Sequence, residues 1–206
     1  MRTKTILTTR RLRLRTWRGG DATAYQKHCN TDDVMEHLGG VMTPRRLKLE
    51  VKWLIRNQQR DGISFWVMER KRDHAFVGFC GLIRVRETNS NLLGRIEIGW
   101  RVRSDMWRRG YAYEAAQAVL NYGTAHFGEQ LISRVSPGNV ASRGLMHKLG
   151  MRRMPELDHI DPCDGAPLIV YGFSREEDAL PFFNNFDRDL TEARSSSISP
   201  PSEADC

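Results

Sequence analysis

The sequence lacks the features of a metalloprotein and of a membrane protein. Its four cysteines and six histidines are dispersed, with no Cys-x-x-Cys pair and no Cys/His cluster at metal-ligand spacing. We therefore expect reduced thiols and no metal. No apolar run approaches the roughly 18 residues of a membrane helix, and the N-terminus has no hydrophobic secretory segment. This predicts a soluble cytoplasmic protein without membrane contact.

Two widespread phosphate-binding motifs are also missing. Neither the dinucleotide fingerprint Gly-x-Gly-x-x-Gly nor the Walker-type Gly-Lys-Ser/Thr loop occurs in the chain. The sequence thus gives no indication of a nicotinamide site or an ATP site. If a phosphate is bound, it belongs to another kind of ligand.

The hydrophobic pattern changes its period in the middle of the chain. Residues 95–102 alternate between apolar and polar, which predicts a β-strand. From Gly110 to Phe127 the apolar residues recur every three or four positions, which predicts a helix of about five turns. The N–H groups of a first helical turn lack partners and the helix dipole is positive there, so this junction can hold an anion.

The residues of the junction strengthen that expectation. Gly110 permits a tight turn and a close approach of the backbone to a ligand, while Arg108 and Arg109 add positive charge. Together with Tyr111 and Ala112 at the start of the helix, they suit a pyrophosphate. Taken alone, however, the short motif fits a plain strand-to-helix turn with a solvated basic rim better. The surrounding segments must decide.

Those segments resemble the GNAT family of acetyl-CoA-dependent N-acetyltransferases. That family reads Arg/Gln-x-x-Gly-x-Gly/Ala at this loop, which the chain matches at Gly110 and Ala112 with Trp107 in the first place. Tryptophan is common there in the Rim-type branch of ribosomal-protein acetyltransferases. The resemblance covers roughly residues 6–176. Its other matching segments are residues 9–15, 78–81, 97–100, 138–143 and 148–151.

The resemblance implies both a fold and a donor site. The fold is α/β (α+β): a single domain over residues 1–178 with a mixed, mostly antiparallel sheet, helices on both faces and a splayed central strand pair. Acetyl-CoA is the implied co-substrate, and its pantetheine arm would pair with exposed backbone of the strand. Asn139 would hydrogen-bond that arm, although the residue itself also reads as a helix N-cap. The implied cofactor-binding residues are Trp100, Arg101, Val102, Arg108, Arg109, Gly110, Tyr111, Ala112 and Asn139.

Two residues are candidates for proton transfer. Acetyl transfer needs a neutral amine nitrogen and a proton for the departing thiolate. Glu97, on the strand before the loop, resembles the strand glutamate that acts as general base in many GNAT enzymes; alternatively it only pairs with an arginine such as Arg95 or Arg84. Ser142 matches a serine proposed as the acid in the Rim-type branch. A thiol has a pKa near 8.5, so the thiolate could also leave without an acid.

Periodicity and turn residues predict the other elements and the end of the domain. Residues 179–206 are expected to form a C-terminal extension, disordered from about residue 191 because Ser, Pro and Glu dominate there. The remaining strands are expected over residues 5–16, 63–71, 75–86, 131–136, 151–160 and 167–174. The remaining helices are expected over residues 20–29, 31–38, 44–60 and 139–149.

The net charge of +7 is concentrated near the N-terminus. Alternation places Arg11, Arg13 and Arg15 on one face of the first strand, either as a solvated sheet edge or as a nucleic-acid surface. The solvated edge is favoured because no aromatic residues are interleaved, so nucleic acid is not expected as a partner.

The resemblance implies that the acceptor is an amine, either a protein N-terminus or a small cationic molecule. The segment 20–60 and the acidic loop 152–166 are expected to select it, whereas Trp53 and Trp66 are expected to pack in the core. A homodimer remains open. Two other functions compete with N-acetyl transfer: a CoA-binding regulatory protein without catalysis and a basic RNA-associated module.

Overall fold

The structure of the protein is a computed structural model, in which two units are distinguished. The units are Met1–Ser174 and Arg175–Cys206, and every described residue lies in the first. The described residues are 3–87, 91–127, 131–161 and 165–173. The expected extension over residues 179–206 lies outside them, as does its expected disorder, and both stay predictions.

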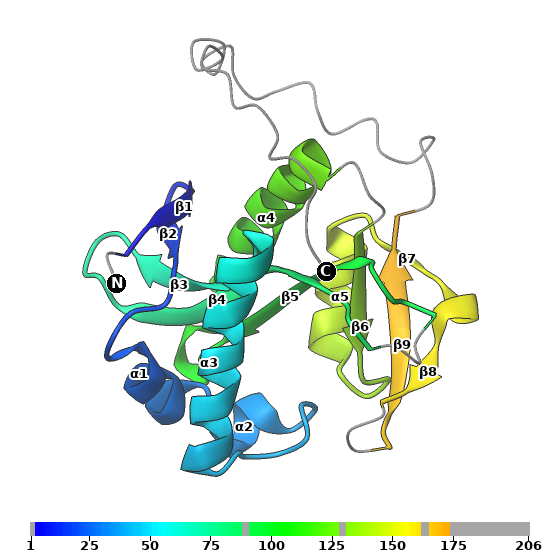
Figure 1. The fold of residues 1–206 in the computed structure, drawn as a ribbon, viewed down its shortest axis with the longest axis horizontal. Helices are drawn as coiled ribbons and strands as arrows, with labels where there is room; N and C mark the ends of the chain where they lie inside the picture. Colours follow the sequence, from blue (N-terminus) through cyan, green and yellow to red (C-terminus); the bar gives the residue numbers. More distant parts are fainter. Residues whose placement is uncertain (1–2, 88–90, 128–130, 162–164, 174–206) are drawn as a thin grey trace, which may run out of the picture. The chain divides into compact units, whose positions relative to one another are not determined.

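The described strands form a mixed sheet in which one pair is parallel (Figure 1). Across the sheet the order is β1-β2-β3-β4-β5-β6-β9-β7, and β8 pairs with β9. Neighbours are antiparallel except β5 and β6, so the expected mostly antiparallel sheet is confirmed. The strands are β1 (Thr5–Thr8), β2 (Leu12–Arg15), β3 (Phe65–Arg70), β4 (Phe76–Arg84), β5 (Ile96–Val102), β6 (Leu131–Val135), β7 (Arg152–Arg153), β8 (His159–Ile160) and β9 (Pro167–Gly172).

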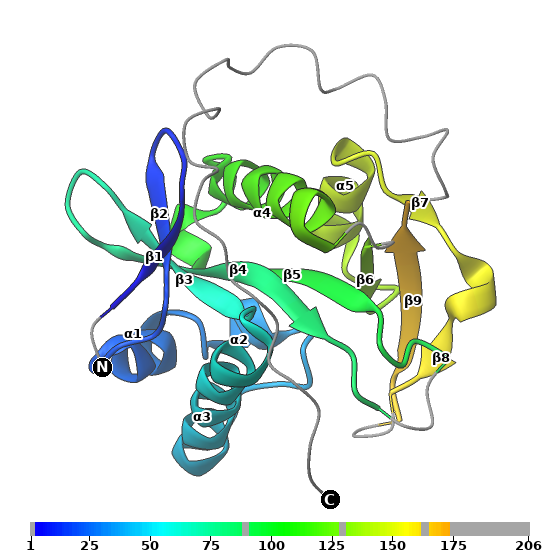
Figure 2. The ribbon, with the colours of Figure 1, turned by 45° about the horizontal axis from the view of Figure 1, so that its top comes forward.

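Helices cover both faces of the sheet, as expected (Figure 2). On one face α4 lies across β4 and β5, and its Val119 shares a core with Leu82 and Ile98. On the other face lie α1, α2 and α3, where Leu54 shares a second core with Phe79. The helices are α1 (Asp21–His28), α2 (Asp32–Met35), α3 (Pro44–Asp61), α4 (Tyr111–Phe127) and α5 (Val140–Lys148).

The parallel pair at the centre of the sheet splays apart, which confirms the expected geometry. β5 and β6 are in register only at Ile96 with Leu131 and at Glu97 with Ile132. On its other edge β5 stays paired with β4 as far as Val102. The last residues of β5 therefore present one edge of their backbone to the space between β5 and α5.

Two expected strands are divided in the structure. Residues 5–16 form the hairpin β1–β2 instead of one strand, with a turn at Thr9, whose hydroxyl accepts a hydrogen bond from the Leu12 N–H at 3.0 Å. The expected strand over 151–160 is interrupted by a 3-10 turn at Pro155–Leu157. Proline has no N–H group to donate to a strand neighbour, which ends the pairing there.

The expectation of a solvated basic edge was wrong. β2 lies between β1 and β3, so it is not an edge strand. Arg15 is only 3% exposed and donates hydrogen bonds to Asp21 at 2.8 and 2.9 Å and to Glu69 at 2.8 Å. Arg13 bonds to Glu69 as well. Both arginines pair with the buried carboxylate of Glu69, and of the two only Arg15 is buried.

Candidate functional site

A cleft of about 590 Å³ opens where β5 leaves β6. Its walls come from the end of β5, the loop before α4, the first turns of α4 and α5, and the segment around α2. The sequence-predicted residues in its lining are Trp100, Arg101, Val102, Arg108, Gly110, Tyr111, Ala112, Asn139 and Ser142. Arg109 and Glu97 are the predicted residues that lie outside the described lining.

The loop before α4 has the backbone shape that an anion site needs. Arg108 and Gly110 both adopt left-handed backbone conformations, with φ of 58° and 76°. The Trp107 indole N–H donates to the Val102 carbonyl at 2.7 Å, which ties the loop to the end of β5. At Gly110 the positive φ strains any side chain, and a Cβ would meet the Arg11 guanidinium at 3.3 Å. The N–H groups of the first turn of α4 are therefore presented to the cleft at a fixed place.

Arg11 holds this loop against the β1–β2 turn, a role that the sequence analysis missed. Its Nη1 donates to the Arg109 carbonyl at 2.8 Å, and its guanidinium carbon lies 4.6 Å from the centre of the Tyr111 ring. Its Nε pairs with Glu114 at 2.5 Å, and the Thr9 hydroxyl and the Arg11 N–H also donate to Glu114. Glu114 is thus neutralised, so the first turn of α4 keeps its positive character.

The opposite wall of the cleft is the start of α5. Asn139 caps this helix, since its side-chain oxygen accepts from the Ser142 N–H at 3.0 Å. This confirms the predicted N-cap. The cap uses only the side-chain oxygen of Asn139, so the amide nitrogen takes no part in it. Lys148, the last residue of α5, also lines the cleft, with its ammonium 4.4 Å from the centre of the Tyr113 ring. Lys148 adds positive charge that the sequence did not single out.

Glu97 lies where the two strands separate, and it is buried. Its Oε2 accepts hydrogen bonds from the Nε of Arg134 at 3.0 Å and from the Nη2 at 2.7 Å. Arg134 stands on β6 and also reaches Glu87. The arginine partner anticipated from the sequence thus exists, but it is Arg134, which was not proposed. The side chain of Glu97 is 11% exposed.

A second cavity, of about 440 Å³, adjoins the cleft on the face of the sheet that carries α3. Leu38 and Arg101 line both spaces. The second lining consists of Met35, Leu38, Met42, Arg46, Leu49, Glu50, Trp53 and Arg101. Trp53 is 43% exposed and lines this cavity, so its expected place in the core was wrong, whereas Trp66 is fully buried as expected.

Two charged side chains meet on the floor of the second cavity. Glu50 accepts a hydrogen bond from the Tyr25 hydroxyl at 3.0 Å and lies 3.7 Å from the Arg101 guanidinium. Burial raises the pKa of Glu50 to about 7, against the opposing effect of the Arg46 charge. Burial also lowers the pKa of Arg101 to about 10, which still leaves it charged at neutral pH. Arg101 stacks over the rings of Tyr25 and Phe79.

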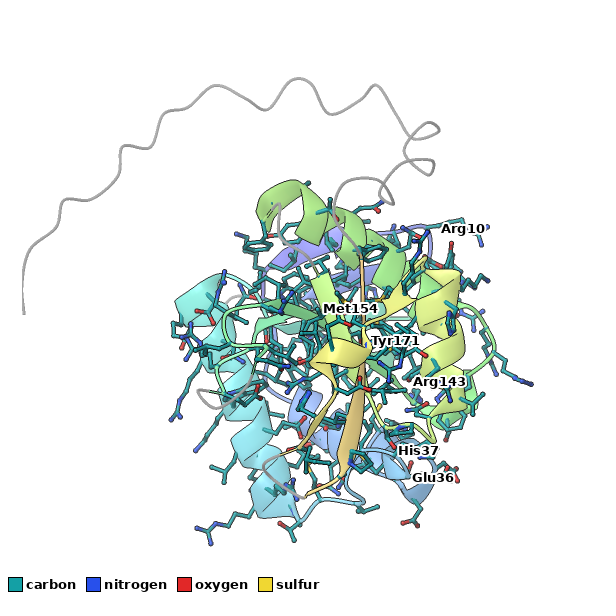
Figure 3. The ribbon with its side chains drawn as sticks, turned by 90° about the vertical axis from the view of Figure 1, so that its right-hand side faces the viewer. Arg10, Glu36, His37, Arg143, Met154 and Tyr171 are labelled. Carbon is teal, nitrogen blue, oxygen red and sulfur yellow. The ribbon has the colours of Figure 1, made fainter. Side chains whose placement is uncertain are left out.

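The acidic loop expected near the acceptor lies elsewhere. Its described residues, 152–161 and 165–166, line neither cavity. Asp158 of this loop is paired with Arg153 and accepts the Val170 N–H at 3.0 Å. Figure 3 shows Tyr171 of β9 beside Arg143 of α5, whose Nε donates to the Tyr171 hydroxyl at 3.4 Å. This loop supports β9 in the part of the structure that is described.

The described residues contain neither a metal-ligand cluster nor a membrane-spanning helix. No group of three His, Cys, Asp or Glu side chains is arranged to hold a metal ion. Among the described helices, none is both long and apolar enough to cross a membrane. Burial raises the pKa of the Cys29 thiol to about 12, so this thiol is not reactive.

The chain is similar to known proteins in sequence. The Acetyltransferase (GNAT) domain matches residues 11–152. YkkB of Bacillus subtilis (strain 168), an uncharacterised protein, is 37% identical over 154 residues, which are 73% of this chain and 87% of YkkB. YnaD of the same strain, an uncharacterised N-acetyltransferase, is 30% identical over 149 residues, which are 71% of this chain and 82% of YnaD.

Solved structures share the fold. An acetyltransferase from Agrobacterium tumefaciens superposes with a TM-score of 0.69 at 23% identity, covering 85% of this chain and 95% of that protein. The RimL ribosomal L7/L12 alpha-N-protein acetyltransferase, solved in complex with coenzyme A, superposes with a TM-score of 0.64 at 13% identity, covering 82% and 97%. At such identities the likeness concerns the fold alone.

Proposed function

The chain belongs to the acetyltransferase (GNAT) domain family, and from that premise we propose that it is an N-acetyltransferase that moves acetyl from acetyl-CoA to a primary amine. The observation that carries the proposal is the cleft between β5 and α5. It gathers the residues predicted to bind coenzyme A, except Arg109, together with Ser142. The amine comes from a protein N-terminus or a small molecule.

The loop before α4 fits the diphosphate of coenzyme A. First-turn N–H groups and the positive end of the helix dipole favour an anion, and Arg108 adds a full charge from the same wall. Lys148 faces the cleft from α5 and supplies a second charge. The glycine at position 110 lets the phosphate approach the backbone closely.

The free edge of β5 fits the pantetheine arm. Beyond Glu97 this edge has no β6 residue in register, so the backbone of Trp100 and Arg101 can pair with the pantetheine amides as a strand would. The Val102 carbonyl accepts a hydrogen bond from the Trp107 indole N–H, so we assign the pairing with pantetheine to the backbone of the residues before Val102. Asn139 lines the opposite wall, and we assign its amide to a hydrogen bond with the arm.

The reaction is direct attack in a ternary complex. The amine nitrogen attacks the thioester carbonyl carbon, so that a C–N bond forms and the C–S bond breaks. One proton leaves the nitrogen, and one proton is taken up by the thiolate sulfur. We assign the first to Glu97, reached through a water because Glu97 does not line the cleft, and the second to the Ser142 hydroxyl, which regains its proton from solvent as Glu97 releases the proton that it accepted.

The competing functions have less support. An RNA-associated module would bind through the N-terminal arginines, but Arg15 is buried between Asp21 and Glu69, and Arg13 and Arg18 are also paired with Glu69. A CoA-binding regulator needs no group for proton transfer. The oriented carboxylate of Glu97 beside the splay favours the enzyme over that alternative.

Two measurements test the proposal. Isothermal titration with acetyl-CoA should show saturable binding, and release of free thiol should depend on an added amine in a screen of small amines and N-terminal peptides. Binding without transfer to any amine would support the regulator instead. No binding, combined with a mobility shift of RNA that weakens steeply with salt, would support the RNA module.

A further inference from the structure

Helix α3 has apolar residues on two faces, and only one of these faces packs in the core. Leu47, Val51 and Leu54 are buried against the sheet. A second stripe, at helical spacing, points into the cavity of about 440 Å³ and consists of Arg46, Leu49, Glu50 and Trp53. Leu49 and Trp53 are 58% and 43% exposed. A helix face left to solvent normally carries polar residues, so this stripe indicates a binding surface.

The opposite wall of the cavity is apolar as well. Met35 of α2 is followed along the chain by Leu38 and Met42, and all three line the space. In Figures 1 and 2 α2 lies beside α3 beneath the sheet. A pocket with such walls and few polar groups is typical of sites for small organic ligands.

The polar groups of the cavity are two guanidiniums and one carboxylate. Glu50 is held by the Tyr25 hydroxyl, and Arg101 lies between Glu50 and the rings of Tyr25 and Phe79. Arg46 stands one turn before Glu50 on α3 and is exposed at the rim. This set does not suit a polycation, because its two positive charges outnumber the one negative charge. It suits a ligand that has both a cationic and an anionic group.

The cavity also adjoins the donor cleft. Leu38 and Arg101 belong to both linings, and Arg101 is a residue of the β5 edge to which we assign the pantetheine arm. A ligand on Glu50 would thus reach the donor along the shared wall. The position therefore fits the acceptor of the proposed transfer.

We propose that this cavity binds the acceptor as an apolar α-amino acid, with Glu50 receiving the amino group and Arg46 and Arg101 receiving the carboxylate. The inference rests on the proposed N-acetyltransferase function and narrows its substrate class. The side chain of the amino acid packs on Leu49, Trp53 and the methionines. The cationic α-amino group first gives one proton to the Glu50 carboxylate. The neutral nitrogen then attacks the thioester carbonyl carbon, the C–N bond forms and the C–S bond breaks, and the nitrogen loses a second proton while the sulfur gains one.

The first test compares acceptors that differ only in the carboxylate. L-leucine with isoamylamine, and L-phenylalanine with phenethylamine, are assayed by acetyl-CoA-dependent thiol release, alongside spermidine and an N-terminal peptide. The amino acids should have kcat/KM values at least about tenfold above those of the matched amines, as a charged hydrogen bond provides. Equal values for the matched pair, or a preference for spermidine or the peptide, would overturn the inference.

The second test uses matched substitutions on α3. Arg46→Met should reduce the ratio of kcat/KM for L-leucine over isoamylamine by about tenfold. Arg45→Met changes the neighbouring exposed arginine, which lies outside the described lining, and should leave the ratio unchanged. Because a general loss of stability would lower both substrates alike, an unchanged ratio in Arg46→Met counts against the inference.

The third test concerns the carboxylate. Glu50→Gln should raise the KM for L-leucine by about tenfold while the Kd for acetyl-CoA stays unchanged. Glu36→Gln, at a carboxylate that is 71% exposed near α2, serves as the control. Transfer to another amine class with normal Glu50→Gln kinetics would refute the inference but keep the proposed function. Acetyl-CoA binding without transfer to any amine would refute both.

Discussion

Arg134 on β6 donates two hydrogen bonds to a single oxygen of Glu97 on β5, from Nε at 3.0 Å and from Nη2 at 2.7 Å. The pair joins the two strands next to the last register contact between them. Because both bonds end on Oε2, the guanidinium fixes the orientation of the carboxylate and leaves Oε1 for proton transfer. Glu97 therefore combines a structural contact with the chemical role that we propose, and experiments can separate the two.

Glu97→Gln should lower kcat by about 10²–10⁴-fold, since the amide keeps the shape of the side chain but cannot accept the proton. The Kd for acetyl-CoA should not change, because Glu97 lies outside the lining of the donor cleft. The matched control is Glu87→Gln, which removes the other carboxylate that Arg134 binds. Thiol release and calorimetry measure the two quantities. Equal kcat losses in both variants would mean that Glu97 only positions Arg134.

Arg108→Ala should weaken acetyl-CoA binding by about tenfold, the usual effect of losing a charge-assisted contact to phosphate. Arg109→Ala is the comparison, because the Arg109 side chain lies outside the described lining and only its carbonyl is held by Arg11. Isothermal titration at two salt concentrations measures both variants. Equal weakening would show that the sequence-based assignment of both arginines to the phosphate was right.

Ser142→Ala should lower kcat at neutral pH, and the defect should fade as the pH rises past about 8.5, where a thiolate no longer needs a proton. Ser142→Thr keeps a hydroxyl and should restore much of the activity. The kcat profile against pH gives the answer. A pH-independent defect would point to a role in shape rather than in proton donation.

Local features of the fold and the donor site could be predicted from the sequence. Gly110, the change of period and the cap at Asn139 all act within a few residues, so their structural meaning is contained in the local pattern. The splayed pair and the helices on both faces followed from the family resemblance. The prediction of a single strand over residues 5–16 was wrong, because a polar turn at Thr9 divides the segment into two paired strands.

Contacts between distant segments could not be predicted. Arg134 is 37 residues from Glu97 and reaches it only through the parallel register of β5 and β6. Arg15 belongs to an alternating segment whose charged side suggested a solvated face. Its acidic partners, Asp21 and Glu69, lie on other elements, so the sequence pattern did not reveal them. The second cavity depends on how α2 lies against α3, which no periodicity in either helix indicates.

Acceptor binding should depend on pH through Glu50. Its raised pKa, about 7, means that the carboxyl group loses its charge as the pH falls through neutrality. The charged and titratable groups facing it are Arg46 on its own helix, Arg101 on β5 and the Tyr25 hydroxyl on α1. The KM for L-leucine should therefore rise below pH 7, and this rise should be absent in Glu50→Gln. A rise that persists in the variant would assign it to another group.

Glu69→Gln should lower the free energy of unfolding at pH 7 by about 3–5 kcal/mol, because it leaves buried Arg15 without one of its two carboxylate partners. Burial alone would raise the pKa of Glu69, but hydrogen bonds from His74 and Arg15 and the charges of Arg15 and Arg18 lower it from 4.5 to about 2. The folded state thus favours the ionised form of Glu69. The stabilisation of the folded protein by this carboxylate is therefore complete above pH 4.5 and is lost as the pH falls towards 2. Asp73→Asn, at a carboxylate that is 41% exposed, is the control and should leave the free energy of unfolding nearly unchanged, because solvent screens an exposed ion pair. Urea unfolding at pH 7 and pH 3 should show the Glu69→Gln defect shrinking at the lower pH, and an equal defect at both would place the stabilisation in packing rather than in charge.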